Sequence, residues 1–227
     1  MAAKLPIAVL ISGTGRTLKN LIDKVEAGEL DVDIRLVVSS SDRAKGLQFA
    51  EQNNIPIAIV KSSQFQTKQE FSDAVFDACR AAKVKYVAMC GYLKLLAIPE
   101  DFRNRVLNIH PSLIPSFCGE NYYGRRVHDA ALRRGVKVSG ATVHFVDNEY
   151  DHGPIILQKT VPVYDNDTVD TLSDRVLLEA EFVAYPEALQ LLAEDRVKCD
   201  DNERDSFRVR ILPPANQTQN LAADGDL

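Results

Sequence analysis

Short apolar runs alternate with amphipathic stretches along the first half of the chain. The runs that have the length and composition of buried strands lie at 7–12, 33–40, 56–61, 85–92 and 105–110. The stretches with apolar residues at helical spacing lie at 18–28, 44–54 and 69–83. Continuous apolar strands that alternate with helices predict a single-domain α/β fold, in which a mostly parallel twisted sheet carries helices on both faces in a Rossmann-like arrangement.

The second half of the chain has a different pattern. Two strand-like runs, 138–147 and 153–163, are separated by a short polar connection, which indicates a mixed or antiparallel extension of the sheet. A long helical pattern follows over about 169–192. The chain then becomes polar, so we expect one domain over residues 1–200 and a loosely packed polar tail over 201–227.

Composition narrows the class of protein. The 227 residues are 45% hydrophobic and 26% charged, which is typical of a globular chain, and the formal net charge of −5 argues against nucleic acid as the main partner. The four cysteines show no CxxC spacing, which favours reduced thiols, and the apolar run at the N-terminus is too short for a signal segment or a membrane span. We therefore expect a cytoplasmic protein that does not cross a membrane.

A glycine loop, "ISGTGRTLKNL", follows the first predicted strand and opens the first predicted helix. Gly13 and Gly15 let the backbone pass close to a ligand, and the helix N-terminus offers unpaired N–H groups that suit a phosphate. Arg16 and Thr17 would add hydrogen bonds. The dinucleotide fingerprint is incomplete because Leu18 stands at its third glycine, and the Walker A pattern is absent. A tight strand–helix turn without a ligand is the alternative.

Two polar residues, Asn108 and His110, stand at the end of the fifth apolar run, in "VLNIHPSLIPSF". Residues two apart on a strand point the same way, so both would face the carboxyl edge of the sheet, where ligands bind in open α/β folds. An amide and an imidazole side by side can stabilise an oxyanion and move a proton. Pro111 and Pro115 would stiffen the exit of the strand. In the alternative interpretation, Asn108 satisfies loop backbone and His110 packs in the core.

A third polar group, Asp151, precedes a Gly-Pro turn in "NEYDHGPI". A carboxylate held by a turn could hydrogen-bond the His110 imidazole and raise its pKa, although an aspartate that only forms the turn is the commoner case. A metal site is a further alternative, since several ligand-type residues lie close in sequence, namely His144, Asp147, Asp151 and His152. Their spacing matches no standard ligand pattern, so no metal is expected.

Four segments together resemble the phosphoribosylglycinamide formyltransferase family, also called glycinamide ribonucleotide transformylases. They are "VLISGTGRTLKNLID", "VLNIHPSLIPSF", "GATVHFVDNEYDHGPIILQ" and "EFVAYP", and the resemblance runs from about residue 7 to residue 186. It implies a single α/β domain that transfers a formyl group from 10-formyltetrahydrofolate to the amine of glycinamide ribonucleotide in purine biosynthesis. It implies no metal.

The resemblance also implies roles for particular residues. The family's catalytic trio falls on Asn108, His110 and Asp151. The positions that contact the ribonucleotide fall on Gly13, Gly15, Arg16, Thr17 and Glu181. The folate cleft falls on Lys68, Leu93, Lys94, Leu95, Leu96, Asn108, Asp147 and Asp151.

The chain departs from the family pattern in two places. Arg16 and Thr17 stand where the family usually has Ser-Asn, and the arginine is expected to strengthen phosphate binding. After Pro115 the chain reads "SFCGENYYGRRVHDAAL", which is longer than the family's compact "PGLHxHxxAL". His128 matches the second histidine of that form, and Arg126 stands in place of the first. The loop on the folate side is therefore expected to be reshaped over 118–126.

Other functions are possible on the same fold. A formyltetrahydrofolate hydrolase shares the trio but lets water attack; that family reads "NIHHS" where this chain reads "NIHPS", and it carries a preceding regulatory domain. A transfer-RNA formyltransferase would need a further C-terminal domain. A non-catalytic nucleotide-binding module would keep the phosphate loop without needing the trio. We expect small-molecule substrates, no nucleic-acid partner, and a monomer or homodimer.

Overall fold

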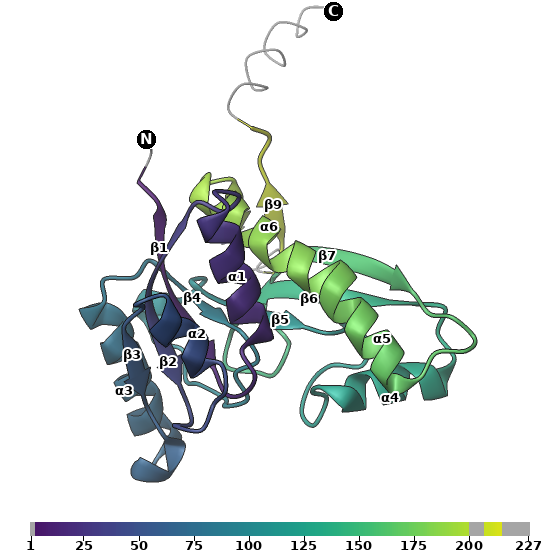
Figure 1. Ribbon diagram of the computed structural model, residues 1–227, viewed down its shortest axis with the longest axis horizontal. Helices are drawn as coiled ribbons and strands as arrows, with labels where there is room; N and C mark the ends of the chain where they lie inside the picture. The colour runs from purple at the N-terminus through teal and green to yellow at the C-terminus, as the bar shows by residue number, and fades with distance from the viewer. Residues whose placement is uncertain (1–2, 200–206, 215–227) are drawn as a thin grey trace, which may run out of the picture.

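A seven-stranded sheet in the order β3-β2-β1-β4-β5-β6-β7 forms the centre of the molecule (Figure 1). The computed structural model describes residues 3–199 and 207–214. The strands are β1 (Leu5–Ile11), β2 (Val32–Ser39), β3 (Ile57–Ile59), β4 (Tyr86–Met89), β5 (Val106–His110), β6 (Val138–Phe145) and β7 (Ile155–Pro162). The helices are α1 (Arg16–Glu26), α2 (Leu47–Gln52), α3 (Lys68–Ala81), α4 (Arg125–Arg134), α5 (Val169–Arg175) and α6 (Phe182–Ala193), with the short helices η1 (Ser62–Gln64) and η2 (Glu100–Phe102) and a π-helical segment η3 (Val176–Glu181).

The pairing of the strands confirms the predicted fold class. β3, β2, β1, β4 and β5 are parallel neighbours. β6 runs antiparallel to β5, and β7 runs antiparallel to β6, so the two strand-like runs of the second half form the expected extension of the sheet. The strand order reverses at β1, which has β2 on one side and β4 on the other; in open parallel sheets this reversal opens a crevice at the carboxyl ends of the strands.

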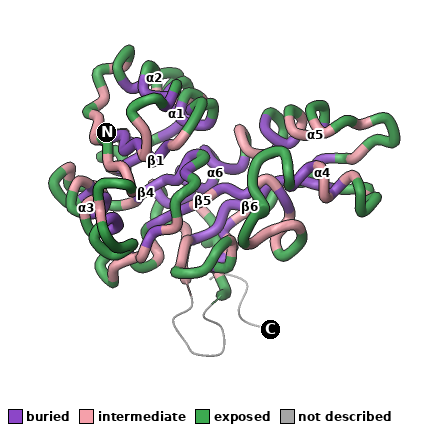
Figure 2. The backbone as a smooth tube through the Cα atoms, turned by 90° about the horizontal axis from the view of Figure 1, so that it is seen from below, coloured by how far each residue is buried: buried purple, intermediate pink, exposed green. Residues whose placement is uncertain are grey.

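Alternation along each strand sends side chains to two separate cores. In β1, Ile7, Val9 and Ile11 join the cluster under α1, α5 and α6, whereas Ala8 and Leu10 join the cluster under α3. All five side chains are fully buried because the sheet is covered on both faces. Figure 2 shows the strands mostly buried inside the molecule and many exposed residues along the helices and loops around them.

The long helical pattern predicted over 169–192 is one rod with an irregular middle. α5 leads into the π-helical η3, which leads into α6, and Pro186 lies inside α6. Proline has no N–H, so the carbonyl of Phe182, four residues earlier, loses its helical donor. The side-chain amide of Asn20 on α1 donates to that carbonyl instead, over 3.1 Å. The irregular helix is therefore tied to α1 at the point where its own hydrogen bonding fails.

The region predicted as a polar tail contains an ordered strand. β9 (Val209–Ile211) pairs antiparallel with β8 (Val197–Cys199), and the amide of Leu212 donates to the carbonyl of Arg196 over 2.8 Å. Val209 also packs against the main core. The rest of the predicted tail, 201–206 and 215–227, lies outside the described residues. Among the residues that are described, no helix has the length and apolarity that crossing a bilayer requires.

Candidate active site

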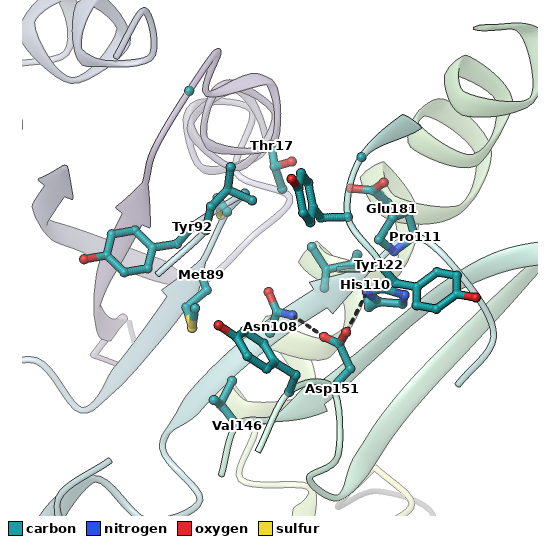
Figure 3. Close-up of a pocket in the computed structure, with 18 of the residues that line it drawn as sticks. Thr17, Met89, Tyr92, Asn108, His110, Pro111, Tyr122, Val146, Asp151 and Glu181 are labelled. Atoms are coloured by element: carbon teal, nitrogen blue, oxygen red, sulfur yellow. Dashed lines mark hydrogen bonds and ion pairs between the residues drawn. The ribbon is translucent and has the colours of Figure 1, made fainter. Parts of the chain in front are cut away.

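A cavity of about 620 Å³ opens at the carboxyl ends of β1, β4 and β5, at the reversal of strand order (Figure 3). The glycine loop after β1 forms one wall, and the segment after β4 forms the wall beside it. The β6–β7 connection and the loop before α4 close the cavity from the other side. The cavity therefore collects residues from distant parts of the chain at the sheet edge where the sequence predicted a site.

Asn108 and His110 reach this cavity from β5. They point to the same side of the sheet because they are two residues apart on the strand, and both line the cavity. His110 is buried, with 3% of its surface exposed, whereas Asn108 is half-buried. His110 is thus as buried as the core-packing alternative expects, but it also lines the cavity and contacts Asp151.

Asp151 joins the other two residues of the predicted trio. Its Oδ2 lies 3.3 Å from Nδ1 of His110 and accepts a 3.0 Å hydrogen bond from the backbone N–H of Gly119. Its Oδ1 lies 3.4 Å from the amide nitrogen of Asn108. Figure 3 shows the carboxylate between the amide and the imidazole. The backbone of Asp151 has a positive φ of 51°, a conformation that non-glycine residues rarely adopt and that is common at functional sites.

The second nitrogen of His110 faces the loop that leaves β5. Nε2 lies 2.9 Å from the carbonyl oxygen of Phe117, another non-glycine residue with a positive φ, of 52°. Both ring nitrogens of His110 thus face acceptors, and a ring with N–H on both nitrogens would donate to both. The loop residue Ser112 donates to the carbonyl of Ser116 over 2.5 Å, which fixes the turn that presents the Phe117 carbonyl.

His144 is a further polar residue of the site. It lies directly opposite Asn108 in the β5–β6 pair, and only 1% of its surface is exposed. Burial lowers the pKa of His144, so the ring is neutral; Nδ1 donates to the Phe145 carbonyl over 2.8 Å. Nε2 is then an acceptor, 3.4 Å from the Asn108 amide nitrogen. The sequence suggested His144 only as a possible metal ligand, because its contact with Asn108 depends on the register of β6.

The glycine loop is shaped by close backbone packing. Gly15 has a φ of 70°, and a Cβ on it would lie 2.5 Å from the Cα of Gly46, so no larger residue fits. α1 then begins without a side-chain cap, which leaves its first N–H groups directed at the cavity. Arg16 lies 3.5 Å from Asp174 of α5 and keeps 54% of its side chain exposed, while Thr17 is buried in the wall. The loop therefore has a geometry that suits an anion, and phosphate binding there stays a prediction.

Glu181 reaches the cavity from the end of η3. Burial raises the pKa of its carboxyl to about 7, and the nearby charge of Arg16 opposes that rise. A π-helical turn adds one residue to the helical repeat and often occurs at functional sites. Here it sets the phase of the helix so that Glu181 faces the glycine loop across the cavity (Figure 3).

Comparison with known proteins assigns the chain to a family. The family model described as formyl transferase matches residues 5–189. The chain belongs to the formyl transferase family. It is 36% identical to the phosphoribosylglycinamide formyltransferase of Haemophilus influenzae, over 86% of this chain and 91% of that protein.

Two further comparisons show where the similarity extends. The chain is 42% identical to the trifunctional purine biosynthetic protein adenosine-3 of Gallus gallus, over 86% of this chain but only 19% of that much longer protein. The crystal structure of glycinamide ribonucleotide transformylase 1 from Symbiobacterium toebii superimposes with a TM-score of 0.85 at 38% identity, covering 94% of this chain and 96% of that one. The chain thus shares the fold of that structure along most of its length.

The residues predicted to bind folate divide into two groups in the structure. Leu93, Lys94, Leu95 and Leu96 line the cavity after β4, and the amide of Leu93 donates to Oγ of Ser12 over 3.1 Å. Lys68 and Asp147 do not belong to the cavity lining. Their predicted contact with folate stays a prediction.

Asp147 instead organises the β6–β7 connection. It accepts from the backbone N–H of Glu149 over 2.9 Å, and its other oxygen lies 2.8 Å from Nδ1 of His152. This hydrogen bond raises the pKa of His152. Asp147 therefore shapes the segment that carries Asp151.

The metal interpretation can be compared with the positions of the four residues in the structure. The four residues considered for it divide into two pairs, His144 with Asp151 and Asp147 with His152. Over residues 3–199 and 207–214, no group of three or more histidine, cysteine, aspartate or glutamate side chains could hold a metal ion.

Proposed function

We propose that this chain transfers a formyl group from 10-formyltetrahydrofolate to the amine of N1-(5-phospho-D-ribosyl)glycinamide, a step of purine biosynthesis. The observation that carries the proposal is the position of Asp151 against both Asn108 and His110 at the floor of the cavity. The relatives that match nearly all of their own length with this chain bear the name of this activity. A binding module would need the glycine loop but not this arrangement of amide, imidazole and carboxylate.

The two ends of the cavity suit the two substrates. The uncapped start of α1 and the exposed guanidinium of Arg16 offer hydrogen bonds and positive charge to the ribose phosphate. Leu93 and Leu95 offer apolar surface to the folate. Asn108 and His110 lie between these ends, where the amine and the formyl group would meet.

In the proposed reaction, the amine nitrogen bonds to the formyl carbon and the carbonyl electrons move onto oxygen. Asn108 donates to the oxyanion through its amide nitrogen, whose contacts with Asp151 and His144 are long at 3.4 Å and are readily exchanged for a substrate oxygen.

The tetrahedral adduct then collapses with loss of the bond to the folate nitrogen. The amine releases one proton and the folate nitrogen gains one, and His110 relays it while Asp151 holds Nδ1. The Nε2 contact with the Phe117 carbonyl opens as the substrate takes its place.

Supplying both substrates to the purified protein tests the proposal. Formylated ribonucleotide and tetrahydrofolate should appear at equal rates, and omission of the ribonucleotide should stop both. Formate released from 10-formyltetrahydrofolate at a comparable rate without ribonucleotide would identify a hydrolase instead.

We propose a cytoplasmic monomer or homodimer that acts on small molecules, without a nucleic-acid or membrane partner and without a metal. Lys68 and Asp147 are proposed to assist at the folate end, the first by charge and the second by shaping the β6–β7 connection.

A further inference from the structure

A second imidazole in the cavity wall, that of His128, is not used by the proposed reaction. His128 lies on α4 with 2% of its surface exposed, and it lines the same cavity as the catalytic trio. Its Nδ1 is buried and has no hydrogen-bond partner. Buried polar side chains normally find partners, so a histidine in a cavity wall whose ring has no hydrogen bond is a candidate for a ligand contact.

The protonation state of His128 follows from its surroundings. Burial lowers its pKa to about 4, and the charges of His110 and Arg125 act in the same direction. The ring is therefore neutral near pH 7 and carries a single N–H. Leaving a buried N–H without an acceptor costs more than leaving a buried acceptor without a donor, so the hydrogen belongs on Nε2 and the bare nitrogen is Nδ1.

The N–H of His128 faces the cavity. Nδ1 is sealed from solvent without a partner, whereas Nε2 is not sealed in this way and has no hydrogen bond among the described residues. Since the side chain lines the cavity, we infer that Nε2 is the nitrogen that reaches it. The wall thus presents one neutral donor in addition to the groups of the trio.

The position of α4 decides which substrate this donor meets. α4 packs beside α5, and an ion pair between Arg125 and Asp170 joins the two helices (Figure 1). α5 also carries Asp174, the partner of Arg16 in the glycine loop. Ser173 of α5 lines the same cavity as His128 and the glycine loop. His128 therefore belongs to the end of the cavity proposed for the ribose phosphate.

We propose that the imidazole N–H of His128 donates a hydrogen bond to an oxygen of the ribose-phosphate part of the ribonucleotide. The inference rests on the proposed function, which supplies the ribonucleotide. Phosphate oxygens and ribose hydroxyls both accept a hydrogen bond from a neutral N–H. In this role His128 binds substrate and takes no part in the transfer of the proton.

Three variants separate this role from a packing role. Glutamine places an amide N–H where Nε2 of histidine stands, asparagine places it where Nδ1 stands, and phenylalanine keeps the volume without a donor. Calorimetry with glycinamide ribonucleotide alone should show about a 10-fold weaker Kd for H128N and H128F, the loss expected for one hydrogen bond, and a Kd for H128Q within about 3-fold of wild type. The KM for the folate should not change.

The outcomes distinguish this inference from the proposed function. Unchanged ribonucleotide affinity in H128N and H128F, with normal formylation, overturns the role of His128 alone. Equal loss in H128Q and H128F assigns the residue to packing and overturns it as well. A wild-type protein that neither binds nor formylates the ribonucleotide overturns the proposed function and the inference together. If H128F melts early, the comparison of H128N with H128Q still decides.

Discussion

Asp151 is the residue on which the geometry of the site depends. One carboxylate oxygen contacts the His110 ring and the backbone N–H of Gly119, and the other faces the Asn108 amide. A carboxylate can serve several donors at once because each oxygen has two lone pairs. Asp151 therefore fixes the orientation of the amide and of the ring relative to each other, and neither would keep it alone.

Replacement of Asp151 by asparagine tests this dependence. We expect kcat to fall by about 10²–10⁴-fold, because the amide keeps the size but cannot hold the imidazole as a proton donor. The melting temperature should change little. D165N, at an exposed aspartate that pairs with Lys137 and does not line the cavity, provides the control. Equal turnover of D151N and wild type contradicts the mechanism.

Glu181 gives the molecule a specific dependence of stability on pH. Its pKa is about 7 in the folded protein against an ordinary value of 4.5, so the folded state holds the proton more tightly than the unfolded state. The contribution of the protonated Glu181 carboxyl to folded-state stability is complete below pH 4.5 and is lost as the pH rises through 7. Glutamine at this position has no such loss.

The expected result is a difference between wild type and E181Q that appears only with rising pH. Near pH ~4 the two free energies of unfolding should agree, and above pH ~8 E181Q should be more stable by ~1–2 kcal/mol, less than the full linkage value because the side chain is partly exposed. Denaturant unfolding across this pH range measures the difference. A constant difference at every pH contradicts the shifted pKa.

The sequence indicates the residues of the site unevenly. Asn108 and His110 could be placed together from strand periodicity alone. Asp151 needed the resemblance to a family, because an aspartate before a glycine usually forms only a turn. His144 and the Phe117 carbonyl were missed, since the first depends on strand register and the second is a backbone atom that side-chain patterns do not reveal.

Among the elements, α1 and its glycine loop are the part on which we expect substrate affinity to depend most directly. Gly15 packs on Gly46, so the loop is rigid, and the helix begins uncapped at the cavity. Arg16 adds the only side-chain charge that the loop itself carries. It is largely exposed, so its contribution should be moderate and should depend on salt.

R16A should raise the KM for the ribonucleotide by about 3–10-fold at low salt and leave kcat nearly unchanged. The effect should shrink as ionic strength increases, because salt screens the exposed charge. K19A, on the same helix but paired with Asp23, is the matched control. Steady-state kinetics at two salt concentrations give the comparison, and a KM equal to that of wild type would show that the loop binds without Arg16.

The contact between α1 and α6 has its own test. The Asn20 amide supplies the hydrogen bond that Pro186 cannot give to the Phe182 carbonyl. N20A should therefore destabilise the protein by ~1–2 kcal/mol, whereas the same change in a P186A background should cost about 1 kcal/mol less, because an alanine at that position restores the backbone N–H. Urea unfolding of wild type, the two single variants and the double variant measures this coupling, and equal costs in both backgrounds contradict it.

Helices and strands could be predicted from the sequence where their hydrophobic pattern repeats over many residues. The helices at 18–28 and 69–83 and the buried strands were predicted, because each repeats its pattern over several turns or residues. The π-helical η3 was not, since one extra residue per turn leaves the composition unchanged. β8 and β9 are only three residues each, too short to show alternation.

At the scale of the whole molecule, the topology explains why distant segments meet. The reversal of strand order at β1 and the antiparallel turn back at β6 bring the glycine loop, the end of β5, the β6–β7 connection and η3 around one cavity. The parallel part was predictable from alternating strands and helices. The register of β6 was not, although it determines that His144 faces Asn108.

The proposed transfer of a formyl group between two small molecules in this cavity can be followed directly. Nuclear magnetic resonance with folate carrying a ¹³C-labelled formyl group follows that carbon directly, with glycinamide ribonucleotide in excess. We expect the label to leave the folate and to appear on the former amine nitrogen of the ribonucleotide, with no build-up of labelled formate. Labelled formate as the main product, or a label that stays on the folate, would contradict the proposed formyl transfer.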